Sequence, residues 1–115
     1  MIDVVLCIRR RGDISEEEFH RYWREDHAKL VASYAELLGM ISYVQHHTAT
    51  TGLEPIVQEA RGCPAEVCFE SLDDMAAKGT EPAALAAAEE MAADERRFID
   101  HANSRIWFTE HYVVV

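Results

Sequence analysis

Three side chains of this sequence could exchange protons with a substrate if the fold brings them together: His27, His47 and Glu66. Imidazoles titrate close to neutral pH, so two of them can share the roles of proton donor and acceptor. In an apolar pocket, desolvation favours the protonated form of a glutamate, which suits a general acid or base. Tyr43 and Trp107 would supply an aromatic shell around this set.

His27 belongs to the most clearly marked helix of the sequence, residues 14–34. Ser15 and Glu18 form a capping box at its start. Steps of about 100° per residue place both His27 and Asp26 inside the apolar stripe of this helix, where an ionisable pair needs a partner or a cavity. Two interpretations stay open: His27 hydrogen-bonds a strand carbonyl and only packs, or it belongs to a functional pocket.

The rest of the chain predicts the order β-α-β-β-α-β, the ferredoxin-like α+β arrangement with a four-stranded antiparallel sheet. The whole chain, residues 1–115, is expected to form one domain. Residues 51–64 read as an irregular connection, and a loop of this length is often a lid over a site. The expected strands cover residues 2–8, 40–50, 65–70 and 105–115, and the later helices cover 71–78 and 82–97.

The predicted strands are apolar on both faces, although two helices can cover only one face of such a sheet. Packing of two sheets against each other would cover the second face. We therefore expect a homodimer that forms an α+β barrel with an interior pocket. If the helices cover the face of Val67 and Phe69, Glu66 points into the barrel. An error of one residue in strand register would exchange the two faces. The strand residues that we assign to the barrel interior are Tyr43, Gln45, His47, Glu66 and Cys68.

Each of these polar residues also has a purely structural explanation. Glu66 could pair with Arg9 across the sheet, and His47 could be exposed at the end of a strand. Trp107 and His111, on the last strand, are more often packing residues than catalytic ones. These alternatives stand beside the assignment to a site.

Composition excludes several classes of protein. The formal net charge is −10 and the basic residues are scattered, which argues against nucleic-acid binding. No apolar run approaches the roughly 20 residues of a membrane span. The N-terminus has no signal-peptide pattern, and three cysteines without C-x-x-C spacing suggest no disulfide framework, so a reducing cytoplasm is expected.

No cofactor or metal site is predicted. There is no Gly-rich phosphate loop and no dinucleotide fingerprint. The adjacent residues His46 and His47 point to opposite faces of a strand and cannot hold one metal ion together. Cys68 has no basic neighbour in the sequence and is expected to be a small buried hydrophobe.

Several stretches of the chain resemble the EthD domain family. That resemblance implies a dimeric α+β barrel, with recurrent polar positions at His27, His47, Glu66 and His111. Cys68 stands where the family usually has an aromatic residue. The matching stretches are Phe19-x-x-Tyr22-Trp23-x-x-x-His27-x-x-Leu30, Tyr43–His47, Ala65–Ser71, Asp94-Glu95-x-x-Phe98-x-Asp100 and Glu110-His111.

The leading hypothesis is a cytoplasmic enzyme without a metal or cofactor. It would act as an isomerase, cyclase, dehydratase or cofactor-independent oxygenase on a small hydrophobic, oxygenated ring compound. His27 and Glu66 would exchange protons, and the other predicted catalytic residue, His47, would position substrate oxygen. The rival hypothesis is a non-catalytic protein that holds a small molecule for a partner oxygenase. The predicted substrate-binding residues are Trp23, Asp26, Tyr43, Cys68, Trp107 and His111.

Overall fold

The computed structural model describes residues 1–49, 52 and 63–115. The order of its main elements confirms the ferredoxin-like prediction. Most of the loop predicted over residues 51–64, and its suggested role as a lid, lies outside the described residues. The elements are β1 (Ile2–Ile8), α1 (Glu16–Tyr22), η1 (Trp23–His27), α2 (Ala28–Leu38), β2 (Met40–Gln45), β3 (Cys63–Phe69), α3 (Leu72–Gly79), α4 (Pro82–Glu95), η2 (His101–Asn103) and β4 (Arg105–Thr109).

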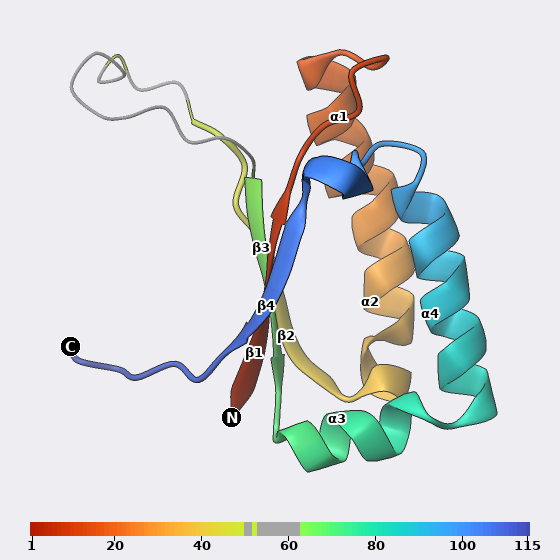
Figure 1. Ribbon diagram of the computed structural model, residues 1–115, viewed down its shortest axis with the longest axis vertical. Helices are drawn as coiled ribbons and strands as arrows, with labels where there is room; N and C mark the ends of the chain where they lie inside the picture. The colour runs from red at the N-terminus through yellow and green to blue at the C-terminus, as the bar shows by residue number, and fades with distance from the viewer. Residues whose placement is uncertain (50–51, 53–62) are drawn as a thin grey trace.

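The four strands form one antiparallel sheet in the order β2-β3-β1-β4. The helices α2 and α4 lie side by side over one face of this sheet, and no described helix covers the other face, which we call the open face (Figure 1). The side chains of Phe19, Trp23 and Phe98 are the largest that are fully buried, and they lie on the helix side. Among the described residues, no helix is long and apolar enough to cross a membrane.

The first helical stretch contains a π-helical turn, Trp23–His27, between α1 and α2. The Ala28 N–H donates to the carbonyl of Trp23, five residues back, so this turn is wider than the 3.6 residues of an α-turn. Trp23 and His27 therefore both point inward and are buried. Asp26 is rotated outward and pairs with Arg21 at 3.3 Å, so the prediction that Asp26 faces the core is wrong.

The glycine at position 39 ends α2. Its φ of 76° lies in the left-handed region, as expected for a residue that stops a helix. The helix itself runs to Leu38, so it ends at the glycine that the sequence indicates as a helix stop. The chain then turns directly into β2, at Met40.

The second strand contains an irregularity that decides which side chains face the helices. Its register against β3 shifts between Met40 and Ser42, after which Tyr43 lies opposite Val67. Residues directly opposite one another in a sheet share a face, so Tyr43 faces the helices. The same register puts Gln45 opposite Ala65, also on the helix side.

The face assignment made from the sequence is therefore half right. The helices cover the face of Val67 and Phe69, and Glu66 and Cys68 lie on the open face, as predicted. The prediction that Tyr43, Gln45 and His47 share the face of Glu66 is wrong. These three residues do share one side of the sheet, but it is the helix side, because the register puts Tyr43 opposite Val67 and Gln45 opposite Ala65. His47 contacts Gln45 and His20 on the helix side.

Candidate active site

A cavity of about 200 Å³ lies between the sheet and the helices α2 and α4. Its walls are mostly aliphatic, with sulfur from Met40 and Met91. The side chains of the lining that can donate or accept a hydrogen bond belong to Trp23, His27, Tyr43 and Glu95. The remaining lining residues are Val4, Leu6, Ile8, Val31, Met40, Ala65, Val67, Phe69, Met91 and Ile99.

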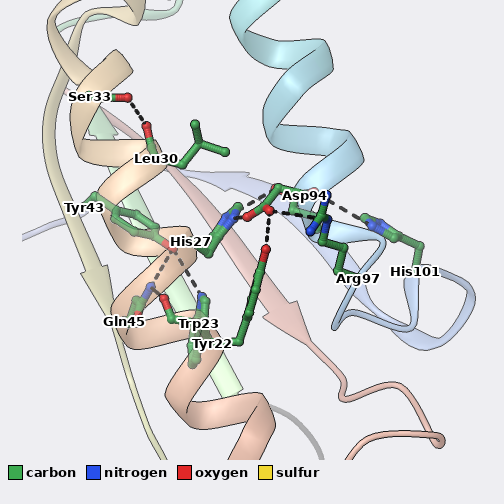
Figure 2. Close-up of polar contacts among 11 residues, drawn as sticks. Tyr22, Trp23, His27, Leu30, Ser33, Tyr43, Gln45, Asp94, Arg97 and His101 are labelled. Atoms are coloured by element: carbon green, nitrogen blue, oxygen red, sulfur yellow. Dashed lines mark hydrogen bonds and ion pairs between the residues drawn. The ribbon is translucent and has the colours of Figure 1, made fainter.

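His27 reaches this cavity from the π-helical turn and is held by a carboxylate on another helix. Its Nδ1 lies 2.8 Å from Oδ2 of Asp94, in the last turn of α4 (Figure 2). The Tyr22 hydroxyl donates to the other oxygen of Asp94 at 2.5 Å. An ionised carboxylate can only accept, so Nδ1 of His27 carries the hydrogen and Nε2 keeps a lone pair.

The burial of His27 sets its protonation state. Only 3% of the residue is exposed, and this burial lowers the pKa of the imidazole below its ordinary value of 6.5. The hydrogen bond and the charge of Asp94 oppose that shift without cancelling it. His27 is therefore a neutral imidazole at neutral pH, with a basic Nε2 and an orientation fixed by Asp94.

A second ionisable group lies beside Nε2. Oε1 of Glu95 is 4.0 Å from His27 Nε2, and Glu95 lines the cavity. Burial raises the pKa of Glu95 above its ordinary value, and the neighbouring Asp94 raises it further. Both carboxylates lie at the C-terminal end of α4, where the helix dipole disfavours negative charge. A carboxyl group in a cavity wall whose pKa is raised by burial is a candidate functional group, and Glu95 is one.

Tyr43 lies in the cavity wall with its hydroxyl oxygen already bonded. Trp23 Nε1 donates to this oxygen at 3.2 Å, and Gln45 Nε2 donates to it at 3.1 Å (Figure 2). With two donors directed at the oxygen, the hydrogen of Tyr43 itself can be donated to a ligand. Burial raises the pKa of Tyr43, so the phenol stays protonated at neutral pH.

The orientation of Gln45 is fixed by two further contacts. Its Nε2 also donates to the backbone carbonyl of Trp23 at 2.9 Å. Its Oε1 therefore accepts from His47 Nε2, at 2.8 Å. The other nitrogen of His47, Nδ1, then accepts from His20 Nδ1 at 2.7 Å. His47 thus holds Gln45 in the orientation that donates to Tyr43. The pKa of His47 is lowered, mainly by burial.

The structure brings together only part of the residue set predicted from the sequence. Trp23, His27 and Tyr43 line the cavity, and His47 joins them through Gln45. Asp26 lies on the outer helix surface. The other predicted residues, Glu66, Cys68, Trp107 and His111, lie on or beside the open face.

Two of these residues have partners that the sequence did not suggest. Glu66 pairs with His46 at 2.7 Å rather than with Arg9. His111 Nδ1 lies 2.6 Å from the carboxylate of Asp3.

Sequence reasoning missed the site roles of Asp94, Glu95 and Gln45. Asp94 lies inside α4 and binds His27. The available signals were the stretch Asp94-Glu95-x-x-Phe98-x-Asp100 and the two carboxylates close to a helix C-terminus.

Comparison with known proteins gives a family and a fold. The EthD domain model matches residues 11–102. No curated protein shows significant similarity to the chain. Among solved structures, an EthD family protein from Bacillus halodurans C-125 is 11% identical with a TM-score of 0.65, over 97% of this chain and 100% of that one.

Two further structural neighbours share the fold at similarly low identity. A dimeric protein of unknown function with a ferredoxin-like fold, from Bacteroides fragilis NCTC 9343, is 14% identical with a TM-score of 0.61, over 96% of this chain and 95% of that one. SnoaB, a cofactor-independent oxygenase from Streptomyces nogalater, is 13% identical with a TM-score of 0.58, over 98% of this chain and 95% of that one.

Proposed function

Because the chain belongs to the EthD domain family, we propose that it is an enzyme that removes a proton from a small, apolar, oxygenated ring compound held between the sheet and the helices. The observation that carries this proposal is the pairing of a neutral, oriented His27 with the hydroxyl donor of Tyr43 in one apolar cavity. No metal or cofactor is required for this step.

The proposed step is proton abstraction next to a carbonyl. Nε2 of His27 takes the proton from carbon, and the electron pair of that C–H bond moves onto the carbonyl oxygen. The O–H of Tyr43 donates to the oxygen as its negative charge develops, which is the kind of interaction that accelerates such reactions most. Isomerisation, cyclisation, dehydration and cofactor-independent oxygenation can each begin from the resulting anion.

The carboxylates of α4 would support this step in different ways. Asp94 stabilises the imidazolium that forms when His27 accepts the proton, because it already binds Nδ1 at 2.8 Å. Glu95 Oε1 lies 4.0 Å from His27 Nε2, so Glu95 can take the proton from the imidazolium and return it to the substrate at another atom, which restores the neutral His27.

The cavity limits the size and polarity of the substrate. Ligand pockets typically enclose roughly 300–1,000 Å³, so a cavity of about 200 Å³ suits a compound with one or two rings. Its walls are mostly aliphatic, and this favours a compound whose few oxygens can reach Tyr43, His27 or Glu95. Aromatic lactones and small cyclic ketones have this character.

We also propose that the chain forms a homodimer through the open face of the sheet. Trp107 is 45% exposed there, next to Val5 in the strand register. Large exposed apolar patches are typical of protein interfaces, and one structural neighbour is described as dimeric. Sedimentation equilibrium of Trp107→Glu should show monomers, whereas Leu85→Glu, on the outer surface of α4, should stay dimeric. A wild-type monomer would contradict this assembly.

The proposed chemistry can be tested before the natural substrate is identified. A panel of aromatic lactones and cyclic ketones is incubated with the protein in deuterated water, and NMR follows the replacement of carbon-bound hydrogen by deuterium next to the carbonyl. We expect the wild type to accelerate this exchange for at least one compound. His27→Asn, which keeps a donor near Asp94, should lose most of the acceleration, about 100-fold or more.

Matched substitutions separate the proposed roles from general damage. His46→Gln changes an exposed histidine, and Tyr112→Phe changes an exposed tyrosine, so both should exchange at the wild-type rate. Tyr43→Phe should be slower by about 100- to 1,000-fold, the usual effect of losing one such donor. Binding without exchange in the wild type would contradict catalysis and favour a protein that holds a small molecule for a partner enzyme.

A further inference from the structure

Three side chains of types that can bind metal ions converge on the open face, away from the cavity. Asp3 on β1 lies directly opposite Cys68 on β3 and, on its other side, opposite Thr109 on β4. His111 follows the end of β4 by two residues, and its contact with Asp3 places it on the same face. Three adjacent strands thus bring together residues from the beginning, the middle and the end of the chain.

The ligand atoms of these residues are already close. One ligand atom each from Asp3, Cys68 and His111 lies within 4.8 Å of the other two. Nδ1 of His111 is 2.6 Å from Oδ2 of Asp3. Asp3 is only 8% exposed and Cys68 only 7%, so a carboxylate and a thiol are buried together.

We propose that Asp3, Cys68 and His111 form a binding site for one divalent cation of the zinc class. A thiolate, an imidazole and a carboxylate are the three ligand types that Zn²⁺ takes in proteins, at about 2.3, 2.0 and 2.0–2.2 Å. Ligand atoms around a tetrahedral ion are then roughly 3.5 Å apart. His111 lies beyond the end of β4 and outside its strand pairing, so its ring can move the short distance from Asp3 that an ion requires.

A water molecule would fill the fourth position of the ion, as in zinc sites with three protein ligands. These three residues are 65 and 43 positions apart in the chain, so no short sequence spacing indicates a metal site here.

The competing explanation is an ion pair alone. Without a cation, His111 donates to Asp3 and fastens the end of β4 to β1, while the Cys68 thiol stays protonated. Burial raises the pKa of that thiol, and the hydrogen bond to Asp3 raises it further. The two explanations differ in one respect: only a metal site requires the sulfur of Cys68.

Cobalt titration tests the proposal directly. The full chain is stripped with a chelator, and Co²⁺ is added while the thiolate-to-cobalt charge-transfer band and the visible bands of tetrahedral cobalt are recorded. We expect both bands to saturate at one ion per chain and to disappear when Zn²⁺ is added. Cys68→Ser should abolish the charge-transfer band. Cys63→Ser, in the core beneath the helices, should keep it.

Substitution of the other two ligands provides the second measurement. His111→Gln should weaken Zn²⁺ binding by more than the roughly 10–100-fold typical of losing a group that only supports a ligand. Asp3→Asn should have a similar effect, whereas His46→Gln, elsewhere on the open face, should bind as the wild type does. Circular dichroism confirms that each variant is folded.

Two outcomes would overturn the proposal. One is the absence of a charge-transfer band in the wild type at saturating Co²⁺. The other is a band that survives both Cys68→Ser and His111→Gln, which would show cobalt bound elsewhere. The test is independent of the proposed catalysis, because it needs no substrate and concerns the opposite face of the sheet.

Discussion

His27 Nδ1 and Asp94 Oδ2 lie 2.8 Å apart, joining the π-helical turn of the first helical stretch to the last turn of α4. The contact links residues 67 positions apart and fixes the tautomer of the histidine. It also places a carboxylate where an imidazolium would form. The proposed proton transfer depends on this pair more than on any other contact.

The first prediction concerns the pKa of His27 itself. In Asp94→Asn the amide oxygen can still accept from Nδ1, but the negative charge is gone. Asp94 raises the pKa of His27 against the lowering by burial, so its removal should lower the pKa of His27 further. An NMR titration of the imidazole measures this. Asp100→Asn, whose carboxylate bonds Asn103, is the control. A higher pKa in Asp94→Asn would contradict the assigned electrostatics.

The second prediction concerns stability below neutral pH. The pKa of His27 is lower in the folded state than the 6.5 of an exposed imidazole. As the pH falls through 6.5, the unfolded chain therefore binds a proton that the folded chain does not, and the free energy of unfolding decreases. The slope for one such group is at most about 1.4 kcal/mol per pH unit.

Urea unfolding at several pH values and one protein concentration measures this slope. His27→Asn should have a shallower slope below neutral pH than the wild type. The pKa of His47 is also lowered in the folded state, so His47 too decreases the free energy of unfolding as the pH falls. His47→Gln should therefore make the slope partly shallower. An unchanged slope in His27→Asn would show that the buried imidazole is protonated in the folded state.

The third prediction compares two glycines. Gly39 has a φ of 76°, and a Cβ there would lie 2.7 Å from Cδ of Lys78. Gly39→Ala should destabilise the protein by about 1–2 kcal/mol, the cost of a left-handed alanine. At Gly79, in α3, a Cβ would meet no atom within 4 Å. Gly79→Ala should stabilise by about 0.4–1 kcal/mol. Equal effects would contradict the turn geometry.

The fourth prediction concerns the aromatic packing behind His27. Phe98 is 1% exposed, and its ring centroid lies 5.0 Å from that of His27. Phe98→Ala should lower the free energy of unfolding by about 3–5 kcal/mol. Leu85→Ala, at a side chain that is 57% exposed on α4, should change it by less than about 0.5 kcal/mol. Similar losses in both variants would contradict the position of the core.

Local signals in the sequence were sufficient for most of the fold. The Ser15 cap, the Gly39 stop and the β-branched runs each act within a few residues, and the element order follows from them. The π-helical turn and the irregularity at the start of β2 have no comparable local signal. Each shifts the direction of the side chains that follow. The π-helical turn rotates Asp26 outward, against the prediction, and the irregularity in β2 leaves both Met40 and Tyr43 on the helix side.

The candidate site was predictable only in part for the same reason. His27 stood out because a polar residue interrupted an apolar stripe, and Tyr43 because of its place in a strand. Asp94 could not be paired with His27 from spacing, since helix packing and not sequence proximity brings them together. The cluster of Asp3, Cys68 and His111 depends in the same way on the pairing of three strands.

The most direct test of the central claim uses the two tryptophans of the chain. Trp23 lines the cavity and donates its indole N–H to Tyr43, whereas Trp107 lies on the open face. Their indole N–H signals in a nitrogen–hydrogen NMR spectrum therefore report separately on the two sides of the sheet. Trp107→Phe assigns the two signals.

The measurement is a titration with the compound that exchanges fastest in deuterated water. If the substrate binds between the sheet and the helices, the Trp23 signal shifts with ligand concentration, and the Trp107 signal stays in place. A shift of the Trp107 signal alone would place the ligand on the open face and contradict the roles proposed for His27 and Tyr43.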